Sequence, residues 1–196
     1  VRERITRVEA LLPDSPRPVR VLLRVVLVRW YATALPHMKA DGDKQVHDVP
    51  APQSNRWTMA QGYAAMIRLF DDLLADEEFL LATPSDALAD LCEPGNMPAR
   101  YRPTLFDWVA IQVVTIVHNV HNGHRFRRSP AWAYTEHSGL ADRTTFLAWQ
   151  VPDDEAEPLL AHAWRWAQRR VAVHLTDRDP TALVDAELLR LDLARD

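Results

Sequence analysis

The segment Arg102–Gly123, which reads RPTLFDWVAIQVVTIVHNVHNG, decides the fold class of this chain. Its apolar residues recur at spacings of three and four and cover nearly the whole circumference of a helix. Thr104 with Asp107 three residues later is typical of a helix start, and Gly123 is a natural helix stop. We therefore expect a long helix here, at the centre of the hydrophobic core.

Apolar residues at helical spacing predict further helices before this segment. A short helix ends before Pro13, a longer one runs from Pro18 to about Leu35, and a third spans Trp57–Ala75. The buried stripe of the second helix is expected to consist of Leu22, Val25, Val26 and Trp30. Thr83 is expected to cap a short helix, with Pro84 in its first turn, that ends near Cys92.

After the segment, one extended piece and two helices are expected. Thr144–Val151 is predicted to be a short strand or an extended piece. A long helix runs from about Glu155 to Thr176, and its inner face is expected to consist of Leu160, Ala163, Trp164, Ala167 and Val171. Trp166 and Arg170 are assigned to the outer row of that helix. Asp179-Pro180 is predicted to cap the last helix.

Two long stretches interrupt the helical pattern, Pro36–Asn55 and Arg125–Arg143. The sequence therefore predicts an all-α fold, an irregular bundle or short solenoid of roughly six to seven antiparallel helices with two long loops. We expect residues 1–196 to form a single helical domain.

Composition narrows the functional classes. The net charge of −4 and a pI near 6.1 lack the basic excess of a typical nucleic-acid-binding domain. The single cysteine, Cys92, excludes an internal disulfide and a cysteine-rich zinc site. Arginines interrupt Val19–Leu35, the best candidate for a membrane span, so no span is expected.

One dense group of possible metal ligands is present: His118, His121 and His124. His118 and His121 are three residues apart, so both can face one side of a helix end, and neutral imidazoles suit zinc. The simpler interpretation is a polar helix C-terminus, where the helix dipole favours histidine. A small helical metal-binding protein or metal-dependent hydrolase is therefore kept as the alternative function, and the metal ligands are left unassigned.

The usual sequence patterns of catalysis are missing. Neither Gly-x-Ser-x-Gly, nor His-Glu-x-x-His, nor a glycine-rich phosphate loop occurs in the chain. Arg125, Arg127 and Arg128, with nearby aromatic residues, form a basic patch that suits a protein partner or packing better than single-stranded nucleic acid. We expect no catalytic residue and no cofactor.

The run Arg102–Trp108 resembles the Arg-Pro-Thr-Leu-Tyr-Asp segment in the N-terminal region of very large bacterial α2-macroglobulin-like proteins. Leu73–Leu81, with the Cys92–Asn96 turn after it, looks like the helix pair before that segment, and Ala182–Leu191 looks like its closing part. The likeness extends loosely over Val19–Leu191 and is specific only around Arg102–Trp108.

The resemblance implies that the chain is a helical fragment of a longer protein, exported to the periplasm or cell surface, whose family traps proteases through a thioester. The thioester pattern Cys-x-Glu-Gln fails at Cys92, which is followed by Glu93 and Pro94, so no thioester role transfers. The expected function is a non-enzymatic structural or protein-interaction domain, with other domains of the parent chain or a protein as partner. The sequence itself leaves a cytoplasmic location open.

Overall fold

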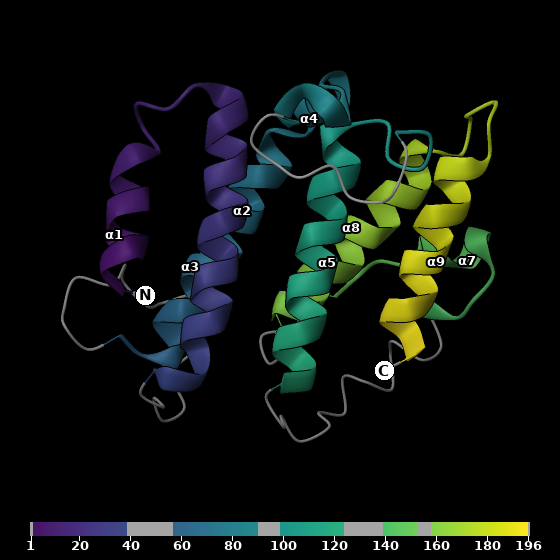
Figure 1. The fold of residues 1–196 in the computed structure, drawn as a ribbon. Coiled ribbons are helices and arrows are strands. Elements are labelled where there is room, and N and C mark those ends of the chain that lie inside the picture. The colour runs from purple at the N-terminus through teal and green to yellow at the C-terminus, as the bar shows by residue number, and fades with distance from the viewer. Residues whose placement is uncertain (1, 39–56, 90–98, 124–138, 153–157, 196) are drawn as a thin grey trace. The chain divides into compact units, whose positions relative to one another are not determined.

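The computed structural model describes residues 2–38, 57–89, 99–123, 139–152 and 158–195 (Figure 1). These residues form eight α-helices and two short 3₁₀ helices, and they contain no β-strand. The all-α prediction is confirmed. The chain divides into two compact units, Val1–Ala75 and Asp76–Asp196, which are described separately. That the whole chain is one domain stays a prediction.

The first unit contains α1 (Arg2–Leu11), α2 (Arg17–Ala34), a 3₁₀ turn (Leu35–His37) and α3 (Met59–Ala75). α2 packs against both α1 and α3. The apolar face of α3 is buried as its spacing predicted, through Met66, Ile67, Phe70 and Leu73. Among the described residues, no helix combines the length and the apolar content that crossing a bilayer requires.

The predicted buried stripe of α2 is wrong at three of its four positions. Val25 is buried, but Leu22, Val26 and Trp30 are only half-buried. The buried residues of α2 are instead Val21, Val25, Leu27, Val28 and Tyr31. Apolar residues surround α2, so the neighbouring helices decide which of them become the core.

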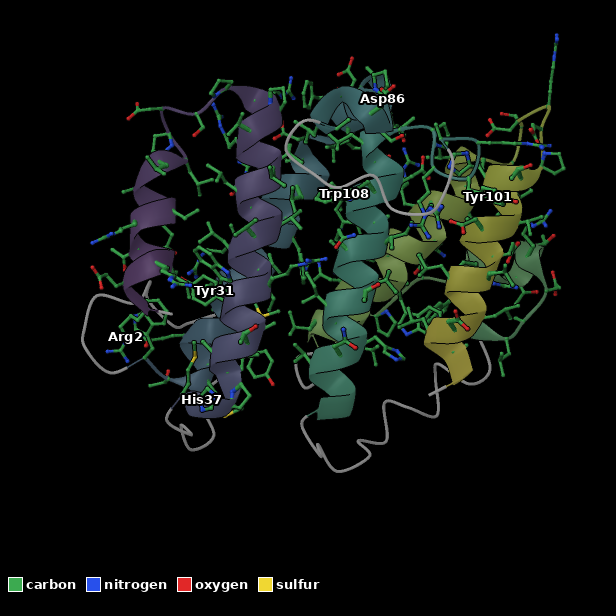
Figure 2. All side chains as sticks on the ribbon, in the orientation of Figure 1. Arg2, Tyr31, His37, Asp86, Tyr101 and Trp108 are labelled. Atoms are coloured by element: carbon green, nitrogen blue, oxygen red, sulfur yellow. The ribbon has the colours of Figure 1, made fainter. Side chains whose placement is uncertain are left out.

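Tyr31 of α2 contacts both α1 and Trp57, which lies just before α3. Its ring stacks on Trp57 at 5.4 Å, and its hydroxyl donates a 2.6 Å hydrogen bond to Glu9 of α1. The guanidinium of Arg2 lies 5.4 Å from the centre of the Trp57 ring; Figure 2 labels Arg2 and Tyr31. Burial and the neighbouring Glu9 carboxylate raise the pKa of Tyr31 well above its ordinary value.

The second unit contains α4 (Glu77–Ala82), a 3₁₀ turn (Ser85–Leu88), α5 (Leu105–Gly123), α7 (Arg143–Ala148), α8 (Pro158–Val173) and α9 (Thr181–Arg195). α5 packs against α4, α8 and α9, and α8 also packs against α7 and α9 (Figure 1). The apolar residues along α5 are buried almost throughout. The prediction that this segment is a central helix is confirmed, with Thr104 at its start and Gly123 as its last residue.

The predicted cap at Thr83 is wrong. The Thr83 hydroxyl donates backward to the carbonyl of Phe79, at the end of α4, over 2.7 Å. The residue that precedes the next turn is Pro84, and Ser85–Leu88 is a 3₁₀ turn. The amide of Leu105 donates to the carbonyl of Thr83, so this residue joins α4 to the start of α5. The expected helix end near Cys92 lies outside the described residues.

The short strand or extended piece predicted at Thr144–Val151 is also wrong over residues 144–148, because Arg143–Ala148 forms α7. The carboxylate of Asp142 accepts hydrogen bonds from the amides of Thr144 and Thr145, at 3.0 and 3.1 Å. This N-terminal cap outweighs the preference of two adjacent β-branched threonines for extended structure. An aspartate two residues before such a pair, as in Asp142-Arg143-Thr144-Thr145, is the pattern that predicts the helix.

The predicted inner face of α8 is confirmed, since all five of its residues are buried. The described helix is shorter than the predicted Glu155–Thr176, and residues 153–157 lie outside the description. The cap of α9 is confirmed as well, because the Asp179 carboxylate accepts from the amide of Thr181 at 3.1 Å.

Candidate functional site

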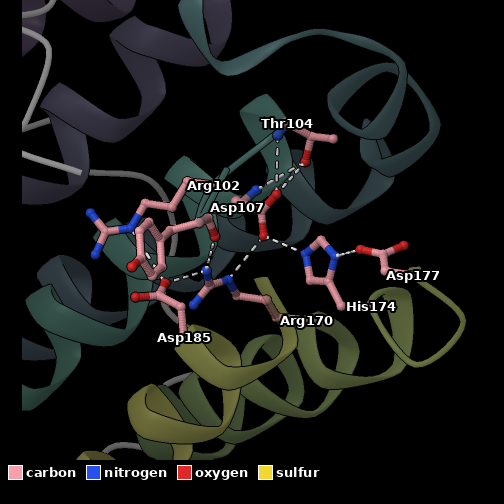
Figure 3. Close-up of polar contacts among 8 residues, drawn as sticks. Arg102, Thr104, Asp107, Arg170, His174, Asp177 and Asp185 are labelled. Atoms are coloured by element: carbon pink, nitrogen blue, oxygen red, sulfur yellow. Dashed lines mark hydrogen bonds and ion pairs between the residues drawn. The ribbon is translucent and has the colours of Figure 1, made fainter. Parts of the chain in front are cut away.

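A group of buried charges lies where α5, α8 and α9 meet, and we call it the charge cluster (Figure 3). Its centre consists of Asp107, Arg170, His174 and Asp185. Arg102 and Asp177 lie at its rim. Burying a charge is costly unless it is paired, so the arrangement of these groups requires an explanation.

The two carboxylate oxygens of Asp107 bind different partners. Its Oδ2 atom accepts hydrogen bonds from the amide and the hydroxyl of Thr104, at 3.1 and 2.8 Å, and so caps α5. Its Oδ1 atom accepts from Nε of Arg170 at 3.0 Å and lies 2.7 Å from Nε2 of His174. One fully buried carboxylate therefore starts α5 and joins it to the C-terminal end of α8.

Arg170 lies on the inside of α8, so its predicted place on the outer row is wrong. It is fully buried, and its Nη2 atom donates to Asp185 of α9 at 2.5 Å and to the carbonyl of Tyr101 at 3.3 Å. Trp166, assigned to the same outer row, is fully buried and stacks on Phe106 of α5 at 5.2 Å. α8 packs against both α5 and α9, so two of its faces are buried rather than one.

His174 follows the last residue of α8, and carboxylates hold both of its ring nitrogens. Nδ1 lies 2.7 Å from Asp177, and Nε2 lies 2.7 Å from Asp107. Ionised carboxylates only accept hydrogen bonds, so each ring nitrogen must carry a proton. The geometry therefore requires an imidazolium, which the negative end of the α8 dipole also favours.

The pKa values agree with this charge state. Burial lowers the pKa of His174, but the hydrogen bonds and charges of Asp107 and Asp177 outweigh it and raise that pKa above its ordinary value. Burial raises the pKa of Asp107, but His174 and Arg170 outweigh it and lower that pKa. The two carboxylates and two cations at the centre of the cluster balance each other in charge.

The cluster is not arranged for nucleophilic catalysis. A general base needs a free nitrogen to accept a proton from a nucleophile, and both nitrogens of His174 contact carboxylates. The nearby hydroxyl of Thr104 donates to Asp107. The charges instead join three helices to one another.

The predicted metal ligands are only partly visible. His118 is half-buried in α5. Only the backbone of His121 is described, and His124 lies outside the described residues. In the part of the chain that the structure describes, no group of three or more histidine, cysteine, aspartate or glutamate side chains is placed to hold a metal ion. Metal binding by the three histidines stays an untested alternative, and Cys92 and Arg125–Arg128 lie outside the described residues.

The sequence predicted Asp107 as a helix cap but not the charge cluster. Arg170 and His174 are four residues apart in the segment predicted to be the helix Glu155–Thr176, and that spacing would place both on one face. Their partners come from other helices, so helical spacing alone does not identify them.

A pocket of about 280 Å³ lies in the first unit. Glu9, Ala65, Arg68, Leu69, Asp71 and Asp72 line it. Glu9 accepts from Tyr31, and Asp72 is 3.6 Å from Arg24, so part of this charge is already paired within the unit.

Comparison of the chain with protein-family models, with curated proteins and with solved structures gave no match.

Proposed function

We propose that this chain is a non-enzymatic structural or protein-interaction domain of an exported α2-macroglobulin-like protein. The family and the export rest on the resemblance at Arg102–Trp108. The partner is an apolar surface of another domain of the same parent chain.

The observation that carries the structural role is the use of the buried charges. Asp107, Arg170 and His174 are almost inaccessible to solvent, and each makes its contacts within the second unit. Groups arranged in this way make the packing of the helices depend on every partner, because the loss of one leaves a buried charge unpaired, and they are not presented to a substrate.

A row of exposed apolar side chains on α9 supports the interaction role. Val184, Leu188 and Leu191 are 52%, 57% and 40% exposed, and their spacing places them on one face of the helix. Rows of this kind are typical of a helix that packs against an apolar surface of a partner. We call these three residues the α9 row.

The interaction role is tested by placing a photo-crosslinking side chain at position 188, and separately at position 11, in cells that make the parent protein. Any cross-linked domain is then purified and its affinity measured. Leu188→Ser should weaken that affinity about tenfold to a hundredfold, because an apolar side chain contributes about 1.5–3 kcal/mol when buried.

Leu11→Ser is the matched control, since Leu11 is 56% exposed on α1 and should leave the affinity unchanged. Equal losses in the two variants, or no cross-link at position 188, would contradict the interaction role.

The metal-binding alternative is tested by a thermal melt with EDTA and then with zinc. We expect both additions to leave the melting temperature unchanged. A ligand that binds only the folded chain adds about 2.7 kcal/mol at a hundredfold excess over its Kd. A zinc-dependent rise that His118→Ala and His121→Ala abolish would favour the metal-binding protein over the scaffold.

A further inference from the structure

His174 is placed where a single proton decides whether the turn after α8 keeps its internal contact with Asp177. It lies in the turn of residues 174–180 between α8 and α9, and it is 2% exposed. One ring nitrogen contacts Asp107 of α5, and the other contacts Asp177 of its own turn. Both contacts require the doubly protonated ring.

We propose that His174 is a pH-sensitive latch, which as an imidazolium holds Asp177 of the turn between α8 and α9 in place and which releases Asp177 when Nδ1 loses its proton, while Nε2–H stays bonded to Asp107 of α5. This proposal is independent of the proposed function.

The two contacts of the ring are unequal, and this decides which one opens. The Asp107 side chain is fully buried, and Thr104 and Arg170 hold its two oxygens. The Asp177 side chain is 40% exposed, so water can replace the ring as its partner. The proton therefore leaves Nδ1 for solvent, while Nε2–H keeps its hydrogen bond to Asp107.

After this loss, the lone pair of Nδ1 faces the Asp177 carboxylate, and repulsion drives Asp177 into water. Loss of the proton also leaves the four central groups of the charge cluster with one negative charge in excess, and this excess adds to the repulsion of Asp177. The charged groups facing the ring or its partners come from each adjacent segment: Asp107 on α5, Arg170 on α8, Asp177 in the turn, Asp185 on α9 and Arg102 before α5.

The full chain can be tested by NMR of the histidine ring nitrogens and by amide hydrogen exchange, from about pH 5 to about pH 9. At low pH both nitrogens of His174 should show the shifts of an imidazolium. As the pH rises from the ordinary histidine pKa of about 6.5 to the titration midpoint of His174 in the folded chain, the protection of the amides at residues 175–179 should fall, by up to about tenfold for each pH unit, and then level off, after correction for intrinsic exchange.

Asp177→Asn removes the charge that holds Nδ1–H, so it should lower the titration midpoint of His174 and abolish the pH-dependent step in exchange. Asp192→Asn is the matched control, because Asp192 is an exposed aspartate on α9. It should change neither quantity.

A neutral His174 ring at about pH 5 would overturn the proposal. The proposal would also be overturned if amide exchange at residues 175–179 did not change as His174 titrates, or if the two variants had equal effects. The ring titration of the unmodified chain decides the charge state without any variant.

Discussion

At the scale of single residues, Arg170 is a fully buried cation that pairs with two carboxylates from two other helices. Its guanidinium contacts Asp107 of α5, Asp185 of α9 and the carbonyl of Tyr101. Removing one member of a buried ion pair leaves the other charges unpaired in a medium that solvates them poorly. The loss of the Arg170 side chain should therefore strongly destabilise the charge cluster.

We predict that Arg170→Met lowers the free energy of unfolding by about 3–5 kcal/mol, because Asp107 and Asp185 then lose their shared cation. A chain of this size should lose about 2–4 °C of melting temperature per kcal/mol. Calorimetry measures both quantities.

Arg100→Met is the control, since Arg100 pairs with Asp179 at the surface and its loss should change little. Equal effects of the two substitutions would show that the buried cluster contributes no more to the free energy of unfolding than a surface ion pair does.

At the scale of elements, hydrogen bonds from side chains cap the starts of α5, α7 and α9. Thr104 and Asp107 bond reciprocally at the start of α5, because the Asp107 amide also donates to the Thr104 hydroxyl at 3.3 Å. This capping box also holds Asp107 in position for the charge cluster. A local change at Thr104 should therefore affect packing against α8 as well as the helix start.

We predict that Thr104→Ala costs about 0.5–2 kcal/mol of stability and increases hydrogen exchange at the first amides of α5. Thr115→Ala is the matched control, because Thr115 is exposed within the same helix and alanine has the higher helix propensity. Urea denaturation of both variants measures the difference. A loss of equal size at Thr115 would contradict the role of the capping box.

At the scale of the whole molecule, the titrating groups of the second unit set how stability depends on pH. Asp107 has a lowered pKa in the folded chain, so its contribution is present above the ordinary value of 3.8 and is lost as the pH falls through the folded pKa. His174 has a raised pKa, so its contribution is present below 6.5 and is lost as the pH rises through the folded pKa.

We therefore predict that stability is highest between these two ordinary values, at about pH 4 to about pH 6.5, and declines on either side. Urea denaturation at a series of pH values measures this profile. Asp177→Asn should flatten its upper side only. A stability that rises steadily from pH 6.5 would contradict the assignment of His174 as a buried imidazolium.

By itself, the sequence determined the helical class, the central helix and the cap at Thr104, because these depend on spacing and on contacts within one turn. It also determined one buried face of α8, the row Leu160, Ala163, Trp164, Ala167 and Val171. The strand or extended piece predicted at Thr144–Val151 was wrong over residues 144–148, because the cap at Asp142 outweighs the preference of β-branched threonines for extended structure.

Only the tertiary structure decided the rest, because it depends on contacts between segments far apart in the chain. An arginine is usually exposed, yet Arg170 is buried because it pairs with Asp107 and Asp185 from two other helices. The stripe of α2 was misplaced for the same reason, because packing against two neighbours selects among its many apolar residues. Helical spacing shows which side chains share a face, whereas the charge and shape of the facing helices decide which of them are buried.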